Sequence, residues 1–171
     1  KKNNKIPKSY INKLDLLLKE RNLKFYMEQK ESRSLNSTNK KSKFSILVII
    51  SGGVSSYKVL ELIRLYYKND FDIEVVLTKS AQQFITPLLV TSLINKKCFT
   101  ELFSSEEKEN MNHINLGRNK DLILVAPCTA NFIAKMTHGI ADDLASNIVL
   151  ASNSKILIAP SMNPYMWENI A

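Results

Sequence analysis

The most constraining feature of the sequence is an unbroken apolar run, Leu122–Ala126, that leads into a polar turn. An apolar run without alternation is typical of a parallel strand buried on both faces. Pro127 follows and has no backbone N–H to donate, so we expect the strand to end there. Thr129 and Asn131 come next, where a new helix is expected to begin. Open α/β sheets bind ligands at such strand-to-helix turns.

The sequence of apolar strand, polar turn and helix recurs along the chain. This alternation predicts an α/β fold with a Rossmann-like (flavodoxin-like) doubly wound parallel sheet. Three further apolar runs predict strands at Phe44–Ile50, Ile73–Leu77 and Ile156–Ala159. We expect helices between the strands: one to about Lys68, one from Pro87 to Ile94 behind an N-cap at Thr86, and one from about Asp142 to Ala151.

The positive charge is concentrated near the N-terminus. Residues 1–43 hold 13 Lys and Arg against 4 Asp and Glu, whereas residues 44–171 hold 11 against 12. Apolar residues at helical spacing over Tyr10–Gln29 predict an amphipathic helix, and the polar stretch Glu31–Lys43 is expected to be a linker. We therefore expect a basic N-terminal extension, residues 1–43, and a folded domain, residues 44–171.

Composition argues against several functions. The extension could contact RNA, a membrane surface or a partner chain, but a solvated appendage is favoured and no nucleic-acid role is expected. No apolar run is long enough to span a membrane and no signal core precedes the domain, so a cytoplasmic protein is expected. Cys98 and Cys128 lack metal-like spacing, and with two histidines no metal site is expected.

The first strand-to-helix turn holds Gly52 and Gly53. Glycines at such a turn let the backbone approach a phosphate group, and a helix N-terminus favours negative charge. The pattern is not Gly-x-Gly-x-x-Gly, and the steric need of a tight turn explains the two glycines about equally well.

Four segments carry a more specific signal: SGGVSSYKVLELIRL from Ser51, LTKSAQQFITP from Leu77, HINLGRNKDLILVAPCTANFIAKMTHGIADDL from His113, and APSMNPYMWEN from Ala159. In this order they resemble the flavin-containing cysteine decarboxylases. Within that family they are most similar to the phosphopantothenoylcysteine decarboxylases of coenzyme A biosynthesis, often the N-terminal half of a bifunctional decarboxylase–ligase. The resemblance covers about Lys43 to Ala171.

The resemblance implies a carboxy-lyase with FMN as cofactor, 4'-phosphopantothenoylcysteine as substrate, and a homotrimer or trimer-based dodecamer. In the family, FMN oxidises the cysteine thiol, the thioaldehyde loses its carboxylate as carbon dioxide, and the reduced flavin then reduces the enethiol. A thiocarbonyl gives the developing carbanion a group into which to delocalise, which explains why oxidation comes first.

Residue by residue, the resemblance implies that His113 is catalytic, as a general base or orienting group near the thiol. It implies that Asn163 and Met162 of the Pro-x-Met-Asn element bind the substrate, with the amide of Asn163 on the substrate carboxylate. Met166 and Trp167 are expected to be packing residues. The positions implied around FMN are Gly53, Ser55, Thr78, Ala81, Thr129 and Asn131.

The chain departs from the family pattern in two places. Where the family has Pro-Ala-Ser-Ala-Asn-Thr, Phe132 removes a hydroxyl and Cys128 is expected to be a small buried residue. The family's flap cysteine, which protonates the intermediate in the final reduction, would fall beyond Ala171. We therefore expect a domain incomplete at its C-terminus that decarboxylates but is defective in the last step. The alternative is a non-catalytic FMN-binding or regulatory subunit of a mixed oligomer.

Overall fold

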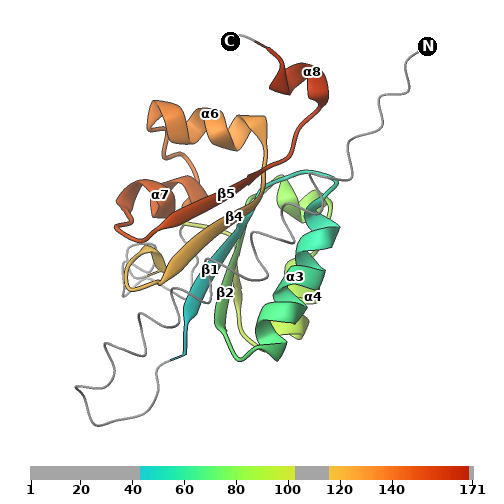
Figure 1. Cartoon of the computed structure of the whole chain (residues 1–171), viewed down its shortest axis with the longest axis vertical. Helices are drawn as coiled ribbons and strands as arrows, with labels where there is room; N and C mark the ends of the chain where they lie inside the picture. The colour runs from blue at the N-terminus through green and yellow to red at the C-terminus, as the bar shows by residue number, and fades with distance from the viewer. Residues whose placement is uncertain (1–42, 103–115, 170–171) are drawn as a thin grey trace. The chain divides into compact units, whose positions relative to one another are not determined.

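The computed structural model describes residues 43–102 and 116–169 (Figure 1). Five parallel strands form one sheet in the order β3-β2-β1-β4-β5. This is the Rossmann order 3-2-1-4-5, and without the two-residue β3 the other strands follow the flavodoxin order 2-1-3-4. The predicted fold class is confirmed. The strands are β1 (Ser45–Ile50), β2 (Asp72–Leu77), β3 (Cys98–Phe99), β4 (Leu122–Cys128) and β5 (Ile156–Pro160).

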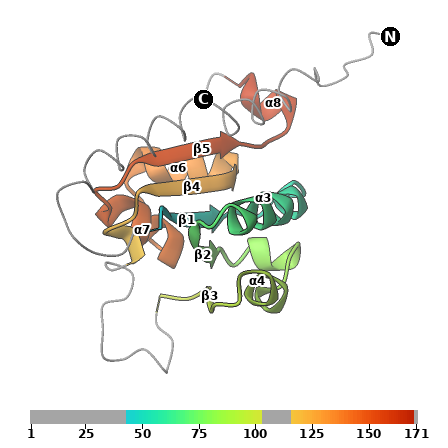
Figure 2. The same ribbon diagram turned by 60° about the horizontal axis from the view of Figure 1, so that its bottom comes forward.

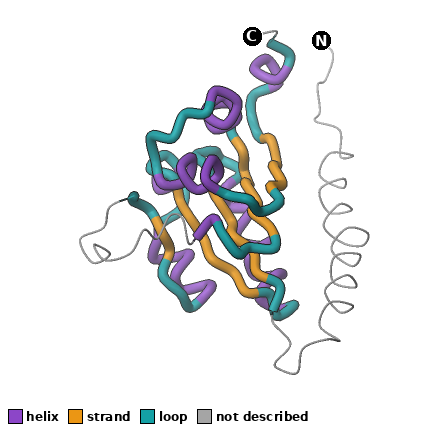
Figure 3. The backbone as a smooth tube through the Cα atoms, turned by 90° about the vertical axis from the view of Figure 1, so that its left-hand side faces the viewer, coloured by secondary structure: helices purple, strands orange, loops and turns teal. Residues whose placement is uncertain are grey.

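Helices cover both faces of this sheet. Figures 1 and 2 show two helices together on one face and two on the other, and Figure 3 shows the strands in orange between them. The first face carries α3 (Ser56–Lys68) and α4 (Pro87–Ile94), and the second carries α6 (Ala130–His138) and α7 (Leu144–Ala151). A 3-10 turn, η1 (Ala81–Gln83), follows β2, and the one-turn helix α8 (Pro164–Trp167) follows β5.

The core is densest around β1, whose residues Ile46–Ile50 have no exposed surface. One cluster joins β1, β2 and β4 to α6 and α7 through buried side chains, among them Leu47, Val125, Phe132 and Ile148. Burial on both faces explains why the central strands are unbroken apolar runs. β5 differs, because as an edge strand it leaves Ile156–Ile158 each about 38–40% exposed.

The prediction that Pro127 ends its strand is wrong, since β4 continues to Cys128. β4 pairs regularly with β5 up to Val125, its register then shifts, and Cys128 pairs with Pro160. Pro127 therefore lies at an irregularity in the hydrogen-bond ladder, where a residue without a backbone N–H is tolerated. Beyond it the Cys128 carbonyl accepts the N–H of Ser161 at 2.8 Å.

Helix starts agree closely with the sequence. Thr86 is the N-cap of α4 and accepts the N–H of Leu89 at 3.2 Å, as its position before Pro87 predicts. Helix α7 begins at Leu144 rather than near Asp142, because Asp143 is its N-cap. β3 and α8 were not predicted, being too short to show a period.

Some predictions fall on residues that the structure does not describe. The Tyr10–Gln29 helix and His113 lie outside the described ranges, as does the linker apart from Lys43. The division into two parts at residue 43 stays a prediction. Over residues 43–102 and 116–169, no helix is both long enough and apolar enough to cross a membrane.

Candidate functional site

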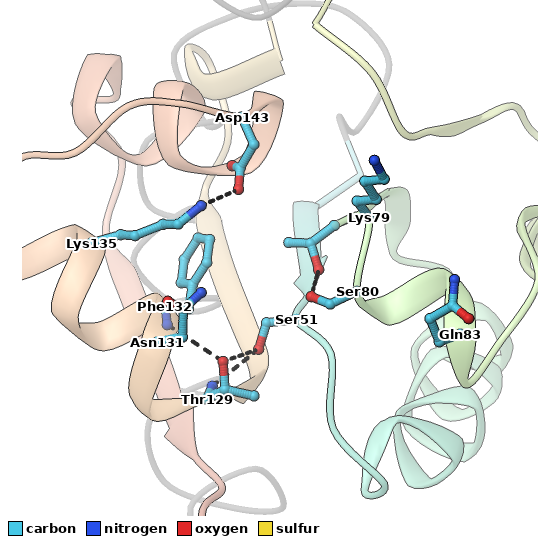
Figure 4. Close-up of a pocket in the computed structure, with 10 residues that line it drawn as sticks. Ser51, Lys79, Ser80, Gln83, Thr129, Asn131, Phe132, Lys135 and Asp143 are labelled. Carbon is cyan, nitrogen blue, oxygen red and sulfur yellow. Dashed lines mark hydrogen bonds and ion pairs between the residues drawn. The ribbon is translucent and has the colours of Figure 1, made fainter.

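A cavity of about 340 Å³ lies at the carboxyl ends of β1, β2 and β4 (Figure 4). β1 and β4 are neighbours from which the chain runs in opposite directions across the sheet, which is where doubly wound folds bind ligands. The volume falls within the range of small-ligand sites. Apart from Phe132, the residues that line it carry polar side chains; the lining consists of Ser51, Thr78, Lys79, Ser80, Gln83, Thr129, Asn131, Phe132, Lys135 and Asp143.

Ser51 joins the ends of β1 and β4 beneath this cavity. Its buried hydroxyl donates to the carbonyl of Pro127 at 2.6 Å and accepts the N–H of Thr129 at 3.0 Å. The Thr129 hydroxyl, 3.2 Å from Ser51 Oγ, caps α6 by accepting the N–H of Phe132. Both turns are thus fixed relative to each other by side-chain hydrogen bonds.

The turn after β1 and the turn after β2 are in direct contact. A methyl group added at Gly52 would lie 2.5 Å from Ser80 Cβ and 2.7 Å from its carbonyl carbon. At Gly53 the nearest atom, a methyl of Thr129, would be 3.5 Å away, an ordinary contact. Gly52 is therefore required by close packing and Gly53 is not. The steric explanation is thus supported for Gly52, and the approach of Gly53 to a phosphate group stays a prediction.

The turn after β2 is organised by Thr78. Its hydroxyl accepts the N–H of Ala81 at 3.2 Å and lies 3.2 Å from the Ser80 hydroxyl. Ala81 has no exposed surface, so it shapes the turn without lining the cavity. Hydroxyl side chains from the three turns that follow β1, β2 and β4 therefore line one cavity (Figure 4).

One ion-pair cluster borders the cavity. Lys135 of α6 lies 2.5 Å from Asp142 and 2.8 Å from Asp143. Burial lowers the pKa of Lys135, but the hydrogen bonds to both carboxylates outweigh it and the pKa is raised. Burial raises the pKa of Asp143, but hydrogen bonds from Lys135 and Ser146 outweigh it and the pKa is lowered. Both groups are held in their charged forms.

The structure brings three of the predicted cofactor positions into this cavity: Thr78, Thr129 and Asn131. Gly53, Ser55 and Ala81 lie in the same turns but do not line it. The hydroxyl of Ser55 is 2.7 Å from that of Ser161, on the turn after β5.

Asn163 is the N-cap of α8, and its Oδ1 accepts the N–H of Tyr165 at 2.9 Å. Met162, beside it, is half-buried. Met166 and Trp167, which were predicted to pack, are 55% and 63% exposed in the single chain, so the prediction is not met within the described residues. They belong to a single turn of helix beyond an edge strand, where the described residues offer little surface to cover them.

The two cysteines and Phe132 are buried. Burial raises the pKa of Cys128 to about 11 and that of Cys98 to about 12, so neither is a nucleophile near neutral pH. Phe132 is 2% exposed, and it supplies an apolar wall where the family pattern has a hydroxyl. His138 is bound to its own helix through the carbonyl of Ala134.

Sequence reasoning missed most of the lining. Ser51 was assigned only to the turn after the first strand, and Lys135 and Asp143 were assigned no role in a site. The signal that could have found them is position, because Ser51, Thr78 and Thr129 each follow a buried strand of one parallel sheet.

Comparison with known proteins identifies the protein family of this chain. The Flavoprotein family model matches residues 34–171, and this chain belongs to that family. It is 42% identical over 123 residues to the coenzyme A biosynthesis bifunctional protein CoaBC of Haemophilus influenzae, covering 72% of this chain and 31% of that protein. Against CoaBC of Escherichia coli the identity is 36%, over 74% of this chain and 31% of that protein.

Solved structures agree with that assignment. The fold matches the FMN-dependent cysteine decarboxylase SpaF with a TM-score of 0.68 and 29% identity, covering 74% of this chain and 73% of that one. It matches a PPC decarboxylase mutant complexed with pantothenoylaminoethenethiol with a TM-score of 0.63 and 26% identity, covering 75% and 72%. The chain spans about a third of the length of the curated relatives it matches.

Proposed function

We propose that this chain carries out the FMN-dependent decarboxylation of 4'-phosphopantothenoylcysteine towards 4'-phosphopantetheine, a step of coenzyme A biosynthesis. The observation that carries the proposal is the similarity to CoaBC, at 42% identity over 72% of this chain. The likeness to a PPC decarboxylase structure points to the decarboxylase half of that bifunctional protein.

The residues at the cavity suit FMN. A ribityl phosphate presents hydroxyl groups and an anion. The hydroxyls of Thr78, Ser80 and Thr129 and the amide of Asn131 line the cavity and can hydrogen-bond to such groups. Lys79 adds a cation, and the buried ring of Phe132 supplies an apolar wall for a flat ring system. When bound, FMN would supply the two-electron oxidation of the substrate thiol and the later return of those electrons.

The chain's own residues would bind and orient the substrate. Asn163 is suited to the substrate carboxylate, because its Oδ1 is used by the α8 cap and, among the described residues, its Nδ2 has no partner and can donate. We assign the proton transfer at the substrate thiol to His113, on the resemblance of its segment. Loss of carbon dioxide from the oxidised substrate leaves the enethiol, which is then reduced.

We also propose that the domain works as a homotrimer, or as a dodecamer of trimers. The resemblance to the cysteine decarboxylases supports this, and so does the exposed apolar surface of β5 and α8, which is Ile156, Leu157, Ile158, Tyr165, Met166 and Trp167. Sedimentation velocity of the FMN-loaded protein tests it. A mass three or twelve times that of the chain is expected, and a monomer at micromolar concentration would contradict it.

The test of the function is to incubate the FMN-loaded protein with 4'-phosphopantothenoylcysteine and to measure the molecular mass of the product by mass spectrometry. Loss of carbon dioxide, giving phosphopantetheine or the unsaturated enethiol, is expected, and accumulation of the enethiol would identify a defect in the last reduction. A chain that binds FMN and leaves the substrate intact would contradict the proposal. That result would favour a non-catalytic FMN-binding subunit acting in a mixed oligomer.

A further inference from the structure

Ser55 occupies the N-cap position of α3, yet its side chain makes no capping hydrogen bond. The N-cap side chains of α4, α6 and α7 (Thr86, Thr129 and Asp143) each accept a backbone N–H of their own helix. Those three residues have extended backbone, whereas Ser55 is helical, with φ −71° and ψ −3°, and is therefore not in the capping conformation. The Ser55 hydroxyl is directed elsewhere.

That hydroxyl is bound to Ser161, with the two oxygens 2.7 Å apart in a half-buried position. Ser161 lies 106 residues further along the chain, in the turn between β5 and α8. Its backbone N–H also donates to the carbonyl of Cys128, at the end of β4. Ser161 is thus held at two points, one in the turn after β1 and one at the last residue of β4.

Asn163 lies two residues beyond this anchor. Its Oδ1 is fixed by the N–H of Tyr165, and within residues 43–102 and 116–169 its Nδ2 makes no hydrogen bond. The turn that carries Asn163 extends from an exposed edge strand into the single turn of α8. The Ser55–Ser161 bond is a direct side-chain link from this turn to the first strand-to-helix turn.

We infer that Ser161 is a positioning residue, which couples the turn that carries Asn163 to the turn at the start of α3 through the hydroxyl of Ser55. Ser161 is the unspecified position of the Pro-x-Met-Asn element. The inference rests on the proposed function for the roles of the two turns. Its consequence is that FMN, by ordering the turn after β1, of which Ser51 lines the cavity, also orders the turn that carries Asn163.

Hydrogen exchange read by mass spectrometry tests this without an activity assay. In the wild type, FMN is expected to slow exchange in residues 161–169 as well as in the turns of its own cavity. Ser161→Ala is expected to speed exchange in 161–169 in the absence of FMN, and to abolish the effect of FMN there while residues 129–132 remain protected. Ser161→Thr keeps the hydroxyl and is expected to restore the wild-type pattern.

Two controls make the result specific. Ser92→Ala also removes a serine hydroxyl, but that hydroxyl binds a carbonyl within α4 and links no two turns. It is expected to leave exchange in 161–169 unchanged. Ser55→Ala should reproduce the Ser161→Ala effect, and the double variant should be no worse than either, because both remove one bond. Additive effects, or an unchanged Ser161→Ala pattern, would overturn the inference, as would a wild type whose residues 161–169 do not respond to bound FMN.

Kinetics separate this inference from the proposed function. If the wild type turns over, Ser161→Ala is expected to raise KM by about fivefold, as loss of one neutral hydrogen bond would, with kcat nearly unchanged. A fall in kcat with unchanged KM would contradict positioning of the substrate. If the wild type produces no carbon dioxide, the proposed function is wrong, and the exchange experiment still decides whether Ser161 couples the turns.

Discussion

Gly52→Ala is expected to disrupt the cavity at the carboxyl ends of β1, β2 and β4, whereas Gly53→Ala at the neighbouring position is not. The methyl group at position 52 would lie 2.5 Å from Ser80 Cβ and 2.6 Å from its Oγ. It would also lie 2.7 Å from the Ser80 carbonyl carbon, which is backbone and cannot rotate away. The turns after β1 and β2 must therefore move apart.

The size of the effect follows from this geometry. Overpacking in a close-packed region costs about 1–3 kcal/mol of the free energy of unfolding, and a clash with backbone belongs in the upper part of that range. At Gly53 the nearest atom is 3.5 Å away, and the only glycine with positive φ among the described residues is Gly139. Gly53→Ala should thus be neutral, or stabilising by about 0.4–1 kcal/mol through the unfolded state.

Urea unfolding of both variants without FMN, followed by FMN titration, measures the two effects separately. Gly52→Ala should lose stability and FMN affinity together. Gly53→Ala should keep its stability, and a loss of FMN affinity alone would support the predicted contact of Gly53 with the cofactor. Equal destabilisation by the two substitutions would refute the steric reasoning, because the structure gives them opposite surroundings.

Four further outcomes are expected. His113→Ala should abolish carbon dioxide release and retain FMN; unchanged release would exclude His113 as the catalytic residue. Asn163→Asp keeps an oxygen for the α8 cap but removes the amide donor, so KM should rise at unchanged stability; an unchanged KM would exclude carboxylate binding. The pKa of Asp143 is lowered and that of Lys135 is raised, so their ion pair stabilises the folded state above about pH 4 and below about pH 10. Lys135→Met should therefore reduce the free energy of unfolding between these limits, as urea unfolding across pH would show. Cys128, with a pKa near 11, should resist iodoacetamide at about pH 8 until urea unfolds the protein, and rapid alkylation would contradict its burial.

The sheet could be predicted because parallel strands buried on both faces leave an unmistakable pattern, seen in Ile46–Ile50 and Leu122–Val125. Thr86 could be predicted as a helix cap, and Thr129 as lying at a helix start, from local chemistry alone. The end of β4 could not, because Pro127 is tolerated only through a shift in register with β5, which depends on the partner strand.

Part of the site could be predicted from the positions of residues that follow the buried strands. Thr78 and Thr129 follow buried strands, so topology alone brings them together. The pairing of Lys135 with Asp143 depends on the chain reversal at Gly139, whose φ of 65° ends α6, and charge spacing does not reveal it. The link between Ser55 and Ser161 joins turns 106 residues apart, and no local pattern indicates it.

The central claim is that this chain binds FMN and decarboxylates 4'-phosphopantothenoylcysteine. The most direct measurement is carbon dioxide release from carboxyl-labelled substrate in a single turnover without oxygen, with FMN-loaded protein in excess. The account predicts nearly complete release of label in step with the loss of flavin absorbance. Retention of the label in the substrate, with FMN bound and its absorbance unchanged, would contradict it.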